Sequence, residues 1–282
     1  MMKIIECPRD AMQGLLEFIP TETKVEYINQ LLKVGFDTID FGSFVSPKAI
    51  PQMRDTEEVL NKLDFGTSKS KLLAIVANLR GAEDAVKFGE IHYLGFPFSI
   101  SETFQRRNTN KSIEQALESL SEIQNLCVNN GKELVAYISM GFGNPYDDPY
   151  NSDIVVKYAE KLVGLGISTI SLADTIGVSN SNNITPLFTN LIAAYPNVEF
   201  GAHLHSNPDT AIEKIDAAFQ AGCHRFDGAI KGYGGCPMAK DDLVGNLATE
   251  TLLNYLEQHK VATSLSYQEF ELSLHMANKV FP

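Results

Sequence analysis

Hydrophobic and polar positions in this chain follow two patterns: helical periodicity, and short runs of consecutive apolar residues. The stretch after Pro20 shows both. Thr21 is expected to cap a helix and Gly35 to end it in a left-handed conformation, with the apolar run 38–41 following as a strand. One face of this helix carries four apolar residues: Val25, Ile28, Leu31 and Leu32.

The strand-and-helix unit returns along the whole chain. Strands are expected at 3–7, 38–41, 72–76, 91–94, 133–138, 169–172, 198–202 and 225–228. Helices are expected at 55–63, 82–88, 112–129, 153–165, 184–194, 208–221 and 243–258, with a last one at 267–279. Five helices end at a glycine: Gly35, Gly89, Gly131, Gly166 and Gly222.

Eight even units predict an α/β fold, a (β/α)8 TIM barrel with an extra C-terminal helix and a single domain over 1–282. An open doubly wound sheet also alternates strands and helices. The even spacing favours closure, and no glycine-rich dinucleotide fingerprint follows the first strand. In such a barrel the chemistry lies at the carboxyl ends of the strands.

Composition narrows the function classes. The 282 residues are 44% hydrophobic and 21% charged, as in an ordinary globular protein. A net charge of -12 argues against nucleic-acid binding. No apolar run is long enough for a membrane span or a secretory signal. Cys7, Cys127 and Cys223 lie in apolar stretches and form no C-x-x-C pair, which indicates reduced core thiols and a cytoplasmic protein.

His203 and His205 are the central candidates for chemistry. Residues two apart on a strand point to the same side, so the pair forms half of a metal site, although two structural histidines explain it equally well. Other strand ends add Arg9, Asp10 and Asn246. A carboxylate, two imidazoles and an amide oxygen suit octahedral Mg²⁺ or Mn²⁺, and Zn²⁺ or Co²⁺ stays open.

Two loops offer further candidates. Cys236 follows Gly234 and Gly235 and precedes Pro237, so its thiol is either an incidental small residue or a proton carrier on a mobile lid. The stretch 104–111 is cationic in an acidic protein. It is either a solvated charge run or a site for phosphates.

Several motifs together resemble the hydroxymethylglutaryl-CoA lyase family, whose metal-dependent TIM barrels are related to isopropylmalate and homocitrate synthases. They are CPRDAMQ, SFVSPKAIPQM, SLADTIGV, GAHLHS, GYGGCPMA and GNLATE. The resemblance extends from about Glu6 to the eighth helix. GGCP followed by GNLATE is its most specific part, because it separates the lyase from the condensing relatives.

The resemblance implies a role for each matching residue. The metal ligands are Asp10, His203, His205 and Asn246. Arg9 stabilises the enolate oxygen, Cys236 is the acid or base on the loop, and Asp40 stands where the family has Glu. Binding of the acyl-CoA substrate is expected from Arg9, Gln13, Lys48, Arg106 and Arg107.

The implied reaction cleaves 3-hydroxy-3-methylglutaryl-CoA to acetoacetate and acetyl-CoA, a step of leucine degradation. It passes through an alkoxide on a divalent metal and a thioester enolate. The base that takes the hydroxyl proton is His203 or a metal-bound water.

Departures from the family pattern leave the substrate open. Ala11 replaces a glycine, Asp40 a glutamate, Met238 a tyrosine and Ser206-Asn207 an Asp-Thr pair, and the loop 139–145 lacks the cysteines of many lyases. A related lyase, aldolase or Claisen-type enzyme for another 3-hydroxyacyl-CoA or 2-oxo acid is therefore the alternative. A non-catalytic metal-binding barrel is the third interpretation, against which the intact ligand set argues. The last helix either caps the barrel base or pairs with a second copy as a homodimer.

Overall fold

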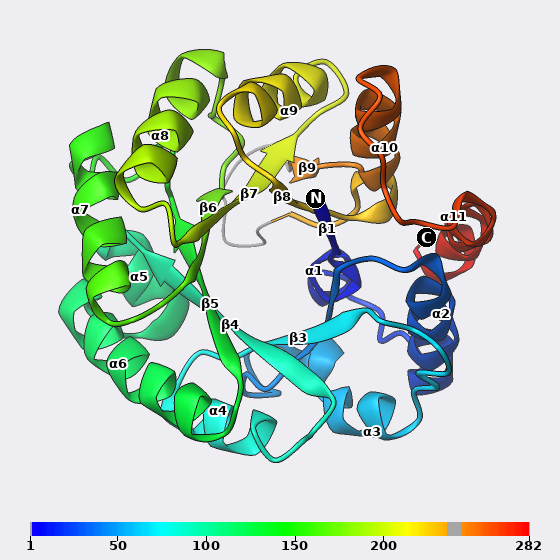
Figure 1. The fold of residues 1–282 in the computed structure, drawn as a ribbon. Helices are drawn as coiled ribbons and strands as arrows, with labels where there is room; N and C mark the ends of the chain where they lie inside the picture. Colours follow the sequence, from blue (N-terminus) through cyan, green and yellow to red (C-terminus); the bar gives the residue numbers. More distant parts are fainter. Residues whose placement is uncertain (1, 236–243, 282) are drawn as a thin grey trace.

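Eight parallel strands close into a ring in the computed structural model, which describes residues 2–235 and 244–281. They are β1 (Lys3–Glu6), β2 (Thr38–Ser43), β3 (Lys71–Ile75), β4 (Ile91–Ser99), β5 (Glu133–Ser139), β6 (Thr169–Asp174), β7 (Glu199–Ser206) and β8 (Arg225–Gly228). Each strand pairs with the next, and β8 pairs with β1. Figure 1 looks down this ring, with helices around it. The predicted TIM barrel is confirmed, and the open sheet is wrong.

The helices surround the ring, apart from the first, which lies within the ring in the view of Figure 1. They are α1 (Pro8–Gln13), α2 (Thr21–Val34), α3 (Thr56–Asn61), α4 (Leu79–Ala85), α5 (Glu102–Thr109), α6 (Ile113–Asn129), α7 (Ser152–Gly164), α8 (Ser181–Ala194), α9 (Ala211–Gln220), α10 (Thr249–Gln258) and α11 (Tyr267–Val280). Short 3₁₀ turns are η1 (Pro51–Met53) and η2 (Ile230–Gly232). Side-chain N-caps start several of them, for example Asn78, Ser112 and Asn151.

The apolar core is divided in two by the barrel wall. The larger part fills the space between strands and helices. A small second cluster lies inside the ring on the β3–β5 side: Leu73, Ile75, Tyr93, Val135 and Tyr137. The opposite half of the interior carries polar side chains, among them Ser171, Arg225 and Asp227. This division places polar groups beneath the carboxyl ends of β6–β8.

Two short helices occupy stretches that the sequence pattern left as loops. Pro8 starts α1, because a proline lacks only a backbone N–H that the first turn leaves free anyway. The cationic stretch 104–111 is mostly helix α5, capped by Ser101 and ended by Asn110 at φ 56°. Arg9 and Asp10 are therefore fixed on a helix directly after β1.

Some predicted element ends are wrong. The helix expected at 243–258 begins only at Thr249, because Gly245–Asn246 forms β9 antiparallel to β7. Leu243 lies outside the described residues. Thr21 does not cap α2, since its hydroxyl donates to Asp55. β4 extends to Ser99, beyond the predicted end.

The glycine pattern is confirmed at four of its five positions. Gly35, Gly131, Gly166 and Gly222 have positive φ, and Gly89 does not. The chain therefore turns after α4 without a residue of positive φ.

Helix α11 lies in the outer layer beside α2, rather than across the base of the barrel (Figure 1). Gln30 donates to Glu269 at 2.8 Å, and the rings of Phe36 and Phe270 meet edge to face. The two ends of the chain are thus packed together. No helix in 2–235 or 244–281 is both long and apolar enough to cross a membrane.

Candidate active site

A cavity of about 630 Å³ opens at the carboxyl ends of the strands. Its lining includes Arg9 and Asp10 from α1, Tyr137 from β5 and the two histidines of β7. Residues far apart in the chain meet here because every parallel strand delivers its carboxyl end to the same rim. This is where the sequence predicted the chemistry.

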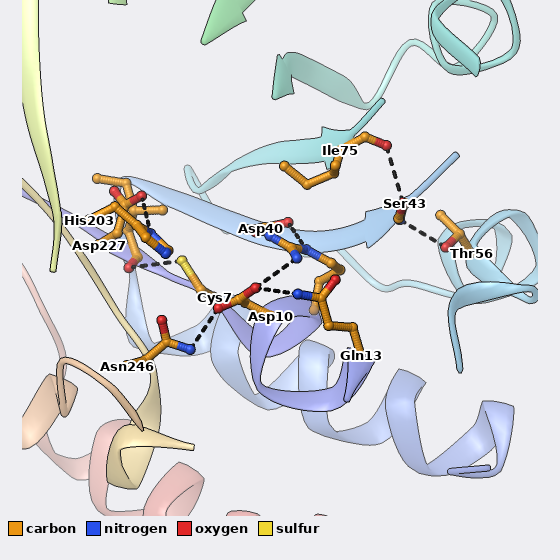
Figure 2. Close-up of polar contacts among 12 residues, drawn as sticks. Cys7, Asp10, Gln13, Asp40, Ser43, Thr56, Ile75, His203, Asp227 and Asn246 are labelled. Carbon is orange, nitrogen blue, oxygen red and sulfur yellow. Dashed lines mark hydrogen bonds and ion pairs between the residues drawn. The ribbon is translucent and has the colours of Figure 1, made fainter. Parts of the chain in front are cut away.

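Asp10 is a cavity-lining carboxylate that accepts hydrogen bonds from three side chains (Figure 2). Its Oδ1 accepts from Arg9 Nη1 at 2.8 Å and from Gln13 Nε2 at 2.7 Å, and its Oδ2 accepts from Asn246 Nδ2 at 2.7 Å. A carboxylate offers about four lone-pair directions, so one stays available. Burial raises the pKa of Asp10, but the charges of Arg9 and the histidines outweigh it and leave the pKa lowered. Asp10 is therefore ionised.

Each of the two histidines has one ring nitrogen fixed by a hydrogen-bond partner. His203 Nδ1 lies 3.1 Å from Asp227 Oδ2, and His205 Nδ1 lies 3.1 Å from the carbonyl oxygen of Thr175. A carbonyl only accepts, so His205 carries its proton on Nδ1 and a lone pair on Nε2. That Nε2 is buried and has no hydrogen-bond partner among the described residues.

The pKa values of the two imidazoles move in opposite directions. Burial lowers the pKa of His203, but the hydrogen bond and charge of Asp227 outweigh it and raise the pKa above the ordinary value. Burial, aided by the charge of His203, lowers the pKa of His205. His205 is consequently the neutral imidazole, the form that binds metals.

The residues present fit a divalent cation. One ligand atom each from Asp10, His203 and His205 lies within 4.8 Å of the others. The unpartnered Nε2 of His205 and the free lone pair of Asp10 are both electron-pair donors, and a metal ion accepts such pairs. This combination of oxygen and nitrogen donors suits a divalent metal.

A second cluster of Cys7, His203 and Asp227 shares one histidine with the first. Burial, together with the charge of Asp227, raises the pKa of the Cys7 thiol well above its ordinary value. A protonated thiol is a poor ligand, so Cys7 is the buried core residue that the sequence predicted.

Arg9 is held by Asp40 from behind. Its Nη2 lies 2.5 Å and its Nε 3.1 Å from Asp40 Oδ2, and both side chains are buried. Burial raises the pKa of Asp40 to about 6, against the charge of Arg9. The shorter side chain at position 40 thus still reaches the guanidinium.

Asn246 lies beside Asp10, but with its amide nitrogen toward the carboxylate and toward the Tyr233 carbonyl at 2.9 Å. Strand β9 sets this position by pairing Asn246 with His205. In this arrangement Asn246 orients Asp10. Ligation through Oδ1, as predicted, requires the amide to turn.

The predicted substrate-binding cations separate into two groups. Arg107 lines the cavity, with its guanidinium 4.7 Å from the Tyr146 ring centre. Arg106 pairs with Glu102 at 2.7 Å, and Lys48 is exposed; neither is among the lining residues. Gln13 lines the cavity while bonded to Asp10.

Other positions were missed or cannot be placed. Arg54 lines the cavity and stacks at 3.5 Å over Phe18, a contact that no sequence pattern signalled. Asp227 was also missed. It lies two residues after Arg225 in the predicted strand 225–228, so both charged side chains point to the same face, and this pattern could have indicated it.

Three predicted positions do not lie in the described lining. Ala11 is buried and absent from the described lining. Cys236 and Met238 lie outside the described residues.

Comparisons with known proteins agree on one family. The family model described as HMGL-like matches residues 2–275. The hydroxymethylglutaryl-CoA lyase YngG of Bacillus subtilis is 36% identical over 262 residues, covering 93% of this chain and 87% of the relative. The mitochondrial hydroxymethylglutaryl-CoA lyase of Mus musculus is 33% identical, covering 95% and 82%.

Solved structures agree with the sequences. The HMG-CoA lyase of Bacillus subtilis superposes with a TM-score of 0.92 at 33% identity, covering 99% of this chain and 93% of the other. An HMG-CoA lyase of Acinetobacter baumannii in complex with coenzyme A and 3-methylmalate gives 0.91 at 29% identity, covering 99% and 91%.

Proposed function

The chain belongs to the HMGL-like family, and from this we infer that its barrel is a carbon–carbon lyase that cleaves 3-hydroxy-3-methylglutaryl-CoA to acetoacetate and acetyl-CoA. One observation carries the assignment at the level of residues. Asp10, His203 and His205 converge at the base of the cavity, directly beside the Arg9–Asp40 pair.

We propose Asp10, His203 and His205 as holders of a divalent metal, Mg²⁺ or Mn²⁺, with Asn246 as a fourth ligand once its amide turns. When bound, such a metal supplies Lewis-acid stabilisation of negative charge on substrate oxygens. Arg9, Asp227 and Thr175 fix the orientation of this set before any ligand arrives.

Arg9 stabilises the negative charge that develops on the thioester oxygen. Its guanidinium is permanently charged, buried, and held on two sides by Asp40 and Asp10. A fixed cation in a poorly hydrated site stabilises an enolate without having to reorganise. Asp40 is therefore the residue that orients Arg9.

His203 has a single ring nitrogen left for chemistry, because Nδ1 is bonded to Asp227. One lone pair cannot hold a metal and accept a proton at the same time. We assign Nε2 to ligation, since Asp10 and His205 converge on the same place. Water in the cavity then accepts the hydroxyl proton, and Cys236 keeps its predicted role in protonating the product carbanion.

The cavity suits an acyl-CoA. It is about 630 Å³, and its outer wall carries Arg54 and Arg107, two cations that can face phosphates. The coenzyme A in the Acinetobacter baumannii structure supports this use of the cavity. Lys48, on the loop after β2, and Arg106, on α5, lie outside the lining and stay predicted secondary contacts.

The cellular setting is a separate proposal. The buried free thiols Cys7, Cys127 and Cys223 support a reducing compartment, for which we propose the cytoplasm. Curated relatives include cytoplasmic and mitochondrial lyases. A place in leucine degradation follows if the proposed substrate is the one used.

The test is an assay of purified protein with Mg²⁺ or Mn²⁺ and 3-hydroxy-3-methylglutaryl-CoA. We expect acetoacetate and acetyl-CoA in equal amounts, and no turnover after chelation of the metal. Absence of product while Mn²⁺ still binds would contradict this substrate and favour a related 3-hydroxyacyl-CoA or 2-oxo acid. Failure to bind either metal would contradict the site itself.

A further inference from the structure

Four positions on neighbouring strands form one level inside the barrel. Tyr137 pairs in register with Ser171, Ser171 with Gly201, and Gly201 with Arg225. Residues paired in register point to the same face of a sheet, and Tyr137 faces the interior because it lines the cavity. Ser171 and Arg225 therefore also point into the barrel.

Gly201 makes room for the arginine at this level. A Cβ atom at position 201 would lie 3.0 Å from Arg225 Cδ and 3.2 Å from Ser171 Oγ. The side chain of Arg225 thus passes across the glycine toward Ser171. Its guanidinium is fully buried and 5.7 Å from the centre of the Tyr93 ring.

The polar atoms at this level are largely unpartnered. Arg225 Nη1 lies 3.4 Å from Glu199 Oε2, a long contact. Five buried atoms nearby have no hydrogen-bond partner within 2–235 and 244–281: Arg225 Nε, Arg225 Nη2, Tyr137 Oη, Ser171 Oγ and Asp227 Oδ1. Leaving a buried polar atom without a partner destabilises the folded protein, so a group of such atoms indicates bound water.

The charges of this region select water over an ion. Arg225 and Lys3 are balanced by Glu199 and Asp227, and Lys3 already pairs with Glu199 at 2.7 Å. The guanidinium and hydroxyl groups need acceptors, whereas Asp227 Oδ1 needs a donor. Only a small neutral molecule that both donates and accepts satisfies all of them.

We propose that Arg225 is a positioning residue for the site: water held between its guanidinium and Asp227 fixes Asp227, and Asp227 fixes the His203 ring. Arg225 and Asp227 are two residues apart on β8, so both face the interior. The other oxygen of Asp227 is the one bonded to His203 Nδ1. The role in turnover rests on the function proposed above; the role in holding His203 does not.

The experiment compares Arg225→Met, which removes the guanidinium, with Arg225→Lys, which keeps a charged donor. Three quantities are measured: the Kd for Mn²⁺, the ring-nitrogen NMR shifts of His203 and His205 in metal-free protein, and kcat and KM for the thioester. Loss of an outer partner of a metal ligand typically costs about 10–100-fold in affinity or activity.

For Arg225→Met we expect a Kd for Mn²⁺ raised about tenfold and kcat lowered about tenfold. KM should stay unchanged, because Arg225 is not among the described cavity-lining residues. The ring-nitrogen signals of His203 should move and those of His205 should not. Arg225→Lys should recover part of each effect.

Lys3→Met is the matched control, since it removes the other cation that pairs with Glu199. A purely structural role of the charge cluster would make both variants behave alike.

If Arg225→Met does not fold, Ser171→Ala takes its place, with a smaller shift of the His203 signals expected. Unchanged His203 signals and Mn²⁺ affinity in a folded variant would overturn the proposal. If the wild type does not cleave the thioester, the NMR and Mn²⁺ measurements still decide it.

Discussion

Individual side chains in the cavity are each held by more than one neighbour. Asp10 accepts from Arg9, Gln13 and Asn246, and Arg9 also donates to Asp40. Ligand-binding groups fixed in this way lose little conformational freedom when a substrate or metal arrives. The site is therefore prearranged at the level of single residues.

Replacement of Asp10 or His203 by Ala should weaken Mn²⁺ binding by about 100-fold or more, because either change removes one of the three converging side chains that we propose as ligands. Calorimetric titration with Mn²⁺ measures this directly. His92→Ala is the matched control, since His92 is exposed and its ring nitrogen Nδ1 lies 3.0 Å from the carbonyl oxygen of Glu90. Normal Mn²⁺ affinity in Asp10→Ala would show that the ligand assignment is wrong.

Cys236→Ser should lower kcat by about 10²–10⁴-fold, the usual contribution of a positioned acid or base. Mn²⁺ affinity should stay as in the wild type, because the thiol is not assigned to the metal. Steady-state kinetics and titration of the same preparation separate the two. A variant with full turnover would leave this cysteine without a catalytic role.

Secondary-structure elements bring these residues to the rim with local signals that are independent of the site. Helix α6 is an example: Ser112 accepts from the Gln115 backbone N–H, and the Gln115 side chain accepts from the Ser112 N–H. This capping box satisfies two donors that the first turn leaves free. It fixes the residue at which α6 begins.

Ser112→Ala should lower the free energy of unfolding by about 1 kcal/mol, the typical contribution of a side-chain N-cap. Denaturant titration measures it. Glu118→Ala on the exposed face of the same helix is the control and should change stability by less than about 0.5 kcal/mol. Equal effects of the two variants would argue against the cap as the cause.

The whole molecule depends on contacts that close the ring between its two ends. Glu6 of β1 is fully buried; its Oε1 accepts from the Ile230 backbone N–H, and its Oε2 lies 2.6 Å from Thr249 Oγ1. Burial raises the pKa of Glu6 from 4.5 to about 8. This carboxyl joins the first strand to η2 and α10.

The raised pKa predicts a pH-dependent stability. Between the unfolded value of 4.5 and the folded value of about 8, the folded chain holds one proton more than the unfolded chain. The free energy of unfolding should therefore fall as pH rises through this window, by up to about 1.4 kcal/mol per pH unit. Denaturant titrations across the window compare wild type with Glu6→Gln, which should lose this slope. Glu118→Gln should keep it; parallel curves for Glu6→Gln and wild type would contradict the assignment.

The sequence by itself determined the order of elements, the closed barrel and the chemical types at the strand ends. Strand and helix periods are local properties, and parallel strands that close into a ring always deliver their carboxyl ends to one rim. Asp10, His203 and His205 could therefore be grouped from the order of strands along the chain. Gly35 likewise carried a readable cap signal, whereas the cap expected at Thr21 was wrong.

Only the tertiary structure decided which atoms meet. It placed Asp40 behind Arg9, Asp227 under His203 and Arg107 rather than Arg106 on the cavity. Helices α1 and α5 were missed because short helices depend more on tertiary contacts than on propensity. Hydrogen-bond partners and buried charges depend on distances between residues far apart in the chain. Those distances exist only once the barrel has closed.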